Sequence, residues 1–524
     1  MPGIVSHVED QYSTWTGLVY VFNLIVGTGA LTLPAVFNRA GWLLGLTVIC
    51  TLAFISFITV TFVIETMASA NAIMQWKRLQ QMKRVSQTLL ALQVNESQDE
   101  DSDEDQPLVS PGVSWEKFPS QLQRYYMIQE KIEMGQMASL FFTRGGRTLF
   151  FLCFAIYLYG DLSIYGTAVA KSLADVACTY QPANYSCNMT LPVSALCWEN
   201  SDITRADAYR IFLGVFICTL GPFVFFNVQK TKYLQILTSV MRWLGLHYNI
   251  LCLNIKCVSQ WRKRAAFGFM TVYAAYKLIV EGPKGHPPAA DLLGVPSLFG
   301  ACVYSFMCHH SLPALVAPIA DKSKLTRCLA LDYLLITVFY LLLAMTGAFA
   351  FQHLDDLYTL DFGPRGSGDC NSDDVGLLMK VIEYFLALFP VFTLSTSFPI
   401  IAITLRNNLK SLFLTDGRHY RWCIRKVVFP LLAIVPPFVV AFTTEDLKKL
   451  VAITGSYAGA GIQYFIPAAL VLAARKKTME VIGMGVKNDF SSPFSGRGWV
   501  IFVIIWAIAC LILVSVNFIK IYVM

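Results

Sequence analysis

The chain has 524 residues, of which 55% are hydrophobic and only 14% are charged. Soluble domains carry about 25% charged residues, so this composition excludes an ordinary soluble protein and indicates that most of the chain lies in lipid. The net charge of +7 is modest and no basic helix or zinc-knuckle pattern accompanies it, which argues against nucleic-acid binding.

About eleven apolar runs are long enough to cross a bilayer, which requires about 20 residues for each helix. In chain order they are 14–37, 42–65, 148–172, 209–227, 233–280, 297–319, 330–352, 375–404, 425–442, 447–473 and 498–521. The pattern predicts an all-α integral membrane protein with about eleven transmembrane helices.

The fifth run is too long for a single crossing, and the basic segment Gln260–Arg264 interrupts it. Two separate crossings would turn the basic residues of all later loops outward, against the positive-inside rule. We therefore predict one crossing with surplus residues around 247–264. This surplus is either a genuine insertion or an artefact of the gene model.

Lysines and arginines gather in the loops that follow the even-numbered runs. The positive-inside rule then predicts a cytoplasmic N-terminus and an extracellular or luminal C-terminus, in the plasma membrane or a lysosomal or endosomal membrane. The predicted divisions are a cytoplasmic N-terminus (1–13), a first transmembrane pair (14–74), a cytoplasmic loop (75–146), a transmembrane core (147–473) with a luminal loop (173–208), a second cytoplasmic loop (474–497) and a last helix (498–524).

The 75–146 loop contains an acidic cluster at 99–105 among serines and prolines. A segment of this composition cannot bury enough apolar surface to fold alone, so we predict that the loop is largely disordered. Such a loop is suited to binding cytoplasmic partners.

The predicted outer loops carry two glycosylation sequons, at Asn184 and Asn188. They also carry four cysteines that lie outside the apolar runs: Cys178, Cys187, Cys197 and Cys370. Glycosylation and an oxidising environment belong to the same side of a membrane. Four cysteines allow three pairings, and the sequence leaves the choice among them open.

Glycine and proline interrupt the first and the sixth runs, at 23–34 and 304–313. An interrupted helix in lipid must line protein or a cavity, because its freed backbone groups need partners. Breaks at corresponding positions of two halves are typical of a transporter binding site, and they correspond here if repeats run over spans 1–5 and 6–10. The alternative is that the glycines only permit close helix packing.

The break at Gly27, Thr28 and Gly29 would expose N–H groups at the start of a half-helix, which suits a carboxylate. Carbonyl groups freed nearby would suit a cation. In the eighth run, the hydroxyls of Thr393, Thr396 and Ser397 would either supply oxygen ligands to a small cation or bond to their own helix backbone.

Ionisable residues inside spans are costly, which makes Asp161 in the third run a functional candidate. His309 and His310 lie in the sixth-run break and titrate near physiological pH, which suits a proton-coupled step. The alternative for each histidine is a satisfied polar residue in a water-filled vestibule. Hydrolase, phosphate-binding, kinase and metal-ligand patterns are absent from the sequence. We therefore predict no enzymatic activity, no catalytic residues, no metal site and no cofactor other than a coupling sodium ion or proton.

Four segments carry a resemblance to the transmembrane protein 104 family that runs along nearly the whole chain. They are Tyr20–Thr32, Val228–Ser239, Val303–Pro313 and Phe398–Ala402. That family is similar to the amino acid/auxin permease group of the amino acid-polyamine-organocation superfamily, which includes sodium-coupled neutral amino acid transporters. The resemblance implies a leucine-transporter-like inverted 5+5 repeat plus one extra helix.

The resemblance also implies site residues. Substrate contacts would come from the broken first and sixth helices, and sodium ligands from the first and eighth. The implied substrate-binding residues are Asn23, Gly27, Thr28, Gly29, Tyr304 and Ser305, and the predicted ion-coupling residues are Thr393, Thr396, Asp161 and His309.

The predicted function is secondary transport of an amino acid or a similar small zwitterion by alternating access, coupled to sodium or protons. Because fold does not determine function, the alternative is a non-transporting membrane sensor or scaffold on the same fold.

Overall fold

The computed structural model describes residues 11–96, 126–180, 192–226, 270–363, 377–414, 421–483 and 487–523. Within them the protein is all-helical, and β pairing is limited to two isolated bridges. Eight of the described helices are long and apolar enough to cross a membrane. The other three predicted runs are the first and sixth, which are broken, and the fifth, described only over Met270–Val280. The all-α membrane fold is confirmed.

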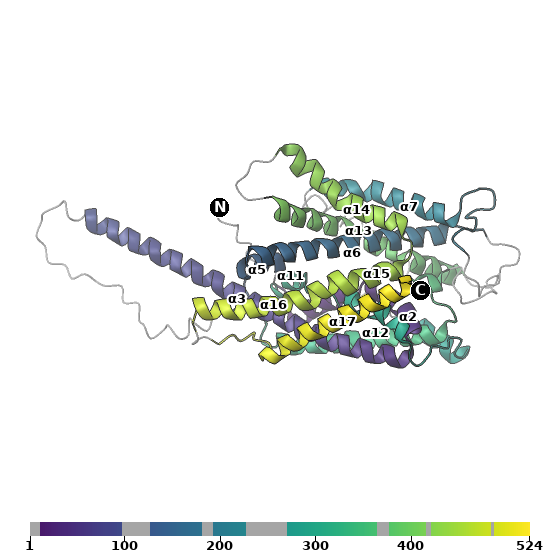
Figure 1. Ribbon diagram of the computed structural model, residues 1–524, viewed down its shortest axis with the longest axis horizontal. Helices are drawn as coiled ribbons and strands as arrows, with labels where there is room; N and C mark the ends of the chain where they lie inside the picture. The colour runs from purple at the N-terminus through teal and green to yellow at the C-terminus, as the bar shows by residue number, and fades with distance from the viewer. Residues whose placement is uncertain are drawn as a thin grey trace, which may run out of the picture.

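The α-helices named in Figure 1 and used below are α1 (Thr14–Ile25), α2 (Thr28–Ala40), α3 (Trp42–Glu96), α5 (Met134–Phe141), α6 (Arg144–Ala177), α7 (Arg205–Leu220), α10 (Val295–Ser305), α11 (Leu312–Val316), α12 (Leu325–Ala350), α13 (Leu377–Phe413), α14 (Phe429–Thr443), α15 (Leu447–Thr454), α16 (Ile466–Val481) and α17 (Arg497–Val523). Shorter turns are the 3-10 segments η2 (Gly221–Phe225), η5 (Leu292–Gly294) and η6 (Leu360–Phe362) and the π segments η8 (Ile424–Val428), η9 (Gly455–Gly459) and η10 (Gly461–Phe465).

Both predicted helix breaks are present. The first run stops at Ile25 and restarts at Thr28, with Gly27 capping the second half. The sixth run stops at Ser305 and restarts at Leu312, where Pro313 occupies the first turn of α11. Proline fits there because the first N–H groups of a helix have no intrahelical acceptor.

The two broken helices lie side by side and run antiparallel. Before α1, the N–H of Tyr12 donates to the carbonyl of Pro318, which follows α11, at 3.1 Å. At the opposite end, the N–H of Asp291, just before α10, donates to the carbonyl of Ala40, the last residue of α2, at 2.8 Å. The beginning of each broken helix therefore meets the end of the other, as an inverted repeat requires.

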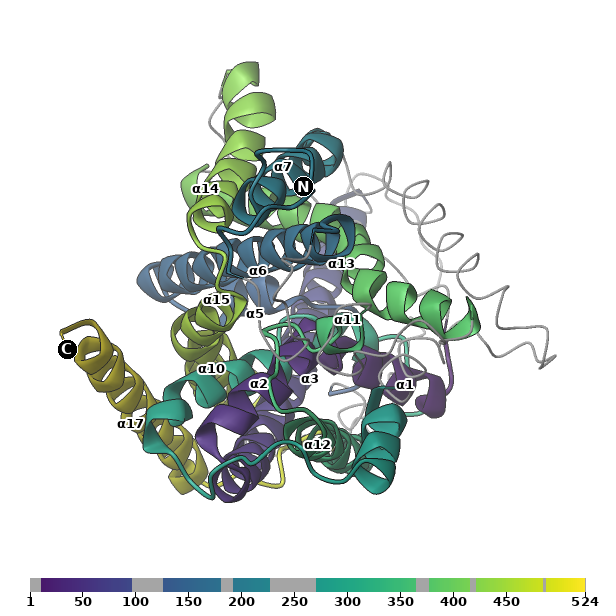
Figure 2. The same cartoon turned by 90° about the vertical axis from the view of Figure 1, so that its right-hand side faces the viewer.

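Most of the other helices fall into two groups (Figure 2). One group contains α3 and α12 with the broken helices, and the other contains α6, α7, α13 and α14. Spans five apart in the chain belong to the same group: the second and seventh in one, the third with the eighth and the fourth with the ninth in the other. The tenth span packs through α15 against both α10 and α6, and α17 lies at the edge of the bundle.

The loops separate to opposite ends of the bundle. The end of α3 and the connection from α16 to α17 lie at one end, and the loop before α7 lies at the other (Figure 1). That loop holds the disulfide Cys178–Cys197, a pair that the sequence allowed but did not choose. Cys187, Cys370, Asn184 and Asn188 lie outside the described residues, as does the 247–264 segment.

The 75–146 segment differs from its expectation at both ends. Helix α3 continues through the second span to Glu96, and residues 126–146 include α5. An ion pair joins Arg78 to Glu130, and the N–H of Glu130 donates to Oδ1 of Asn71 at 2.9 Å. These contacts hold the base of α3 and residues near Glu130 together at the bundle, whereas 97–125 lies outside the described residues.

Candidate functional site

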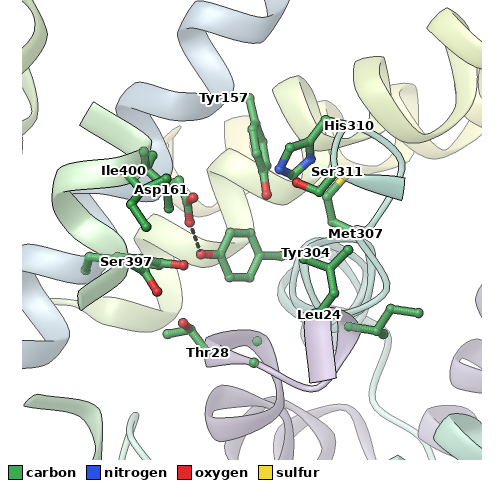
Figure 3. Close-up of a pocket in the computed structure, with 15 residues that line it drawn as sticks. Leu24, Thr28, Tyr157, Asp161, Tyr304, Met307, His310, Ser311, Ser397 and Ile400 are labelled. Carbon is green, nitrogen blue, oxygen red and sulfur yellow. Dashed lines mark hydrogen bonds between the residues drawn. The ribbon is translucent and has the colours of Figure 1, made fainter. Parts of the chain in front are cut away.

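A cavity of about 240 Å³ lies where the two helix breaks meet α6 and α13. It is lined by Leu24, Ile25, Gly27, Thr28, Gly29, Tyr157, Asp161, Tyr165, Tyr304, Met307, His310, Ser311, Ser397, Ile400 and Ile401 (Figure 3). An engineered cavity of about 150 Å³ holds benzene, whereas pockets for drug-sized ligands begin at about 300 Å³. The volume therefore suits a small solute.

Among the described residues, Asp161 is the one acidic residue that lines the cavity, and its side chain is buried. The hydroxyl of Tyr304 donates a hydrogen bond to its carboxylate, from the last turn of α10 (Figure 3). Tyr157 and Tyr165 lie one turn to either side of Asp161 on α6 and also line the cavity. A buried carboxylate that is hydrogen-bonded to a neutral hydroxyl attracts a cationic group.

The opposite electrostatic feature is the N-terminus of α2. Gly27, Thr28 and Gly29 line the cavity where this helix begins. The first N–H groups of a helix have no intrahelical acceptor and carry partial positive charge. The cavity therefore combines an anion-binding helix end with a carboxylate, which together complement a zwitterion.

Glycine at position 29 allows the two breaks to touch. A Cβ atom there would lie 2.6 Å from Cα of Ser305 and 2.9 Å from its backbone N. Ser305 lies behind the cavity wall and is not among the lining residues, and its hydroxyl donates to the carbonyl of Ala301 at 2.7 Å. Of the predicted substrate-binding residues, the cavity thus brings together Gly27, Thr28, Gly29 and Tyr304. The side chain of Asn23 lies outside the described residues.

The two histidines of the sixth-run break face different surroundings. His310 lines the cavity, with its ring near that of Tyr157. His309 is fully buried and is not among the lining residues, and its Nε2 lies 2.8 Å from Oγ1 of Thr59 on α3. Adjacent residues in a turn point in different directions, so His310 is the one that a solute in the cavity would contact.

The hydroxyls of Thr393 and Thr396 donate within α13, to the carbonyls of Phe389 and Thr393 at 2.9 and 2.8 Å. This is the backbone-bonded arrangement that was the alternative to cation ligation. Neither threonine lines the cavity, whereas the neighbouring Ser397 does.

Sequence reasoning did not assign Tyr157, Met307, Ser311 or the two isoleucines of α13 to the site, and it considered Ser397 only as a candidate ion ligand. A signal was present for Tyr157, because residues four apart share a helix face and Asp161 follows it by four. The others depend on how α13 and the 306–311 turn are rotated, which the chain itself does not specify.

Comparison with known proteins identifies the family. The family model described as transmembrane amino acid transporter protein matches residues 10–81 and 121–515. Transmembrane protein 104 homolog of Drosophila melanogaster is 48% identical over 539 residues, covering 99% of both chains. The chain belongs to the transmembrane protein 104 family.

Relatives occur in distant organisms. Human transmembrane protein 104 is 46% identical over 99% of both chains, and the Dictyostelium discoideum homolog is 31% identical over 98% of both. All the residues that line the cavity lie inside the segments matched by the amino acid transporter model. Family membership therefore extends to the parts of the chain that build the site.

Proposed function

We propose that this protein is a secondary transporter of amino acids or similar small zwitterions, coupled to sodium or protons and working by alternating access. The observation that carries the proposal is the cavity at the two helix breaks, with Asp161 on one side and the start of α2 on the other. Membership of an amino acid transporter family supports it.

In this proposal the carboxylate of the substrate binds the N–H groups at Gly27–Gly29, and the ammonium group of the substrate binds Asp161. The ammonium group then replaces the hydroxyl of Tyr304 as the partner of that carboxylate. Met307, Ile400 and Ile401 provide an apolar wall for a small side chain. Discrimination by size follows, because about 240 Å³ must hold the whole solute.

The test is thermal unfolding of the detergent-purified protein with each of the twenty amino acids, with and without sodium, at two pH values. A ligand at 100 times its dissociation constant adds about 2.7 kcal/mol of stability, which is a readable shift. A selective shift supports the proposal. The absence of any shift from a folded sample would favour the sensor or scaffold.

Two substitutions test the site itself. Asp161→Asn removes the partner of the ammonium group, and Gly27→Leu fills the cavity where α2 begins; each should abolish uptake into proteoliposomes and the ligand-induced shift. A hydrogen-bonded charge pair lost from a buried site costs about 3 kcal/mol, or roughly 100-fold in affinity. Uptake that survives Gly27→Leu in a folded protein would refute this site.

One observation favours the alternative of a non-transporting scaffold. The C-terminal part of α3 projects away from the bundle (Figure 1), and its Met82 and Val85 are exposed. A projecting helix with exposed apolar side chains is suited to a cytoplasmic partner, as a scaffold requires.

A further inference from the structure

The hydroxyl of Tyr340, on α12, lies between the two helix breaks. It is 2.9 Å from the carbonyl oxygen of Ile25 and 3.0 Å from that of Ser305. Ile25 is the last residue of α1 and Ser305 is the last residue of α10. One phenol therefore contacts the C-terminal carbonyls of both half-helices.

Two helix C-termini that converge create a concentration of negative charge. Each terminus carries about half an electron charge on its unpaired carbonyl groups, so the two ends repel unless something positive lies between them. In broken-helix transporters generally, such C-terminal ends and freed carbonyls hold the coupling sodium ion or proton. Here the hydroxyl hydrogen of Tyr340 occupies this position, shared between two acceptors as a three-centre hydrogen bond.

The surroundings hold the phenol in place. Tyr340 is fully buried, and its ring packs edge-on against Phe306 with ring centroids 5.2 Å apart. The backbones of the two breaks are already in contact at Gly29 and Ser305. The phenol oxygen, at hydrogen-bond distance from both carbonyls, takes the place that a cation with oxygen ligands at about 2.4 Å would occupy between them.

We propose that Tyr340 replaces the coupling sodium ion between the helix breaks, so that the protein binds its solute without sodium and couples to protons. Tyr340 is then a positioning residue that joins α1, α10 and α12 across the site. The inference deepens the proposed function, since it concerns the coupling ion, but its test does not require an identified substrate. The hydroxyls of Thr393 and Thr396, which bond within α13, are consistent with it.

The experiment is thermal unfolding of the purified full-length protein in sodium chloride, potassium chloride and choline chloride at equal ionic strength. The wild type should unfold at the same temperature in all three salts. A saturable stabilisation by sodium alone, on wild-type protein, would overturn the proposal. This salt comparison can be made whether or not any amino acid stabilises the protein. A negative result for Tyr340 is therefore distinct from a negative result for the proposed function.

Tyr340→Phe removes only the hydroxyl and leaves two carbonyls facing each other. We expect the unfolding temperature to fall by about 1–3 °C, as for the loss of one buried hydrogen bond in a protein of this size, and sodium to restore part of the loss by occupying the vacated position. A Tyr340→Phe protein as stable as the wild type and indifferent to sodium would show that the hydroxyl does not hold the breaks.

The matched control is Tyr209→Phe. The hydroxyl of Tyr209 is buried and donates to the carbonyl of Ala441 at 2.7 Å, joining α7 to α14 away from the breaks. This variant should lose similar stability and gain no response to sodium. If it gained one, the sodium response of Tyr340→Phe would reflect general loosening of the bundle and would not support the proposal.

Discussion

Gly27 and Gly29 lie two residues apart in the same break, yet they have different physical roles. At Gly29 an added Cβ would collide with the backbone of Ser305, which cannot move without shifting α10. At Gly27 the nearest atom to an added Cβ is the carbonyl oxygen of Leu24, at 3.8 Å. Gly29 therefore permits contact between the two broken helices, whereas Gly27 leaves space in the cavity.

This difference predicts that alanine is destabilising at position 29 and tolerated at position 27. Gly29→Ala should destabilise the protein by about 1–3 kcal/mol, as overpacking does, and should abolish ligand-induced stabilisation. Gly27→Ala should leave the free energy of unfolding within about 1 kcal/mol of the wild type. Thermal unfolding of both variants in the same detergent measures the contrast, and equal stability of the two would show that the contact at Ser305 is not rigid.

At the scale of elements, α3 and α16 are joined by a buried ion pair. Arg475 donates to both carboxylate oxygens of Glu65, at 2.6 and 2.7 Å, and the N–H of Ser492 donates to the same carboxylate at 2.9 Å. Arg475 also donates to the carbonyl of Ser495 at 2.9 Å. The second span, the tenth span and the linker to α17 are thus held together at one point.

Glu65→Gln should be strongly destabilising, because it leaves Arg475 without its charged partner in a largely buried position. The expected loss is about 3 kcal/mol in the free energy of unfolding. Glu133→Gln is the control: Glu133 pairs with Lys131 at 3.1 Å, but their side chains are 63% and 40% exposed, so the loss should be below about 1 kcal/mol. Chemical unfolding of both variants tests this, and comparable losses would contradict it.

The loop between α12 and α13 joins α6 and α15 through Asp356, whose carboxylate lies 3.2 Å from Nζ of Lys171 and 2.6 Å from Nζ of Lys448. In the same loop, Asp361 is buried and its Oδ2 has no hydrogen-bond partner among the described residues. Burial raises the pKa of Asp361 well above its ordinary value, and the nearby Asp355 raises it further. Burial also raises the pKa of Asp356, but Lys171 and Lys448 outweigh it and leave that pKa lowered.

These opposite shifts predict a pH dependence. The folded state holds a proton on Asp361 more tightly than the unfolded state, so its contribution to stability grows as pH falls from the raised pKa toward about 4. The unfolding temperature of the wild type should therefore rise as the pH falls from neutral to about 5, and Asp361→Asn should make this rise smaller. Asp356→Asn should lower stability by a nearly constant amount over that range, because the pKa of Asp356 lies below it. An unchanged slope in Asp361→Asn would contradict the assignment.

At the scale of the whole molecule, the cavity and the projecting part of α3 are separate. The elements that line the cavity are matched by the amino acid transporter model, whereas residues 82–120 fall outside that match. The contacts of Asn71 and Arg78 with Glu130 tie the base of α3 to the bundle before the projection begins.

Replacing residues 82–122 by a short Gly-Ser linker should therefore preserve ligand-induced stabilisation and uptake, since the contacts of Asn71 and Arg78 remain. Under the scaffold alternative the same deletion removes binding of cytoplasmic partners. Uptake into proteoliposomes and co-purification from cells measure the two outcomes separately. Loss of uptake in a folded deletion variant would show that the projection belongs to the transport machinery.

The sequence by itself determined the membrane class, the positions of the spans and both helix breaks. These are local properties: the length of an apolar run must match the bilayer, and glycine or proline interrupts a helix wherever it occurs. Asp161 was likewise identified from the sequence, because an isolated carboxylate in an apolar run has few alternatives to a buried functional position.

Only the tertiary structure decided which neighbours meet. It placed His310 rather than His309 on the cavity, Ser397 rather than the two threonines, and joined Cys178 to Cys197. It also brought the hydroxyl of Tyr340 to Ile25, 315 residues away in the chain. Such contacts depend on how each helix is rotated and which helix packs beside it, and these follow from the shape of the whole bundle rather than from any segment alone.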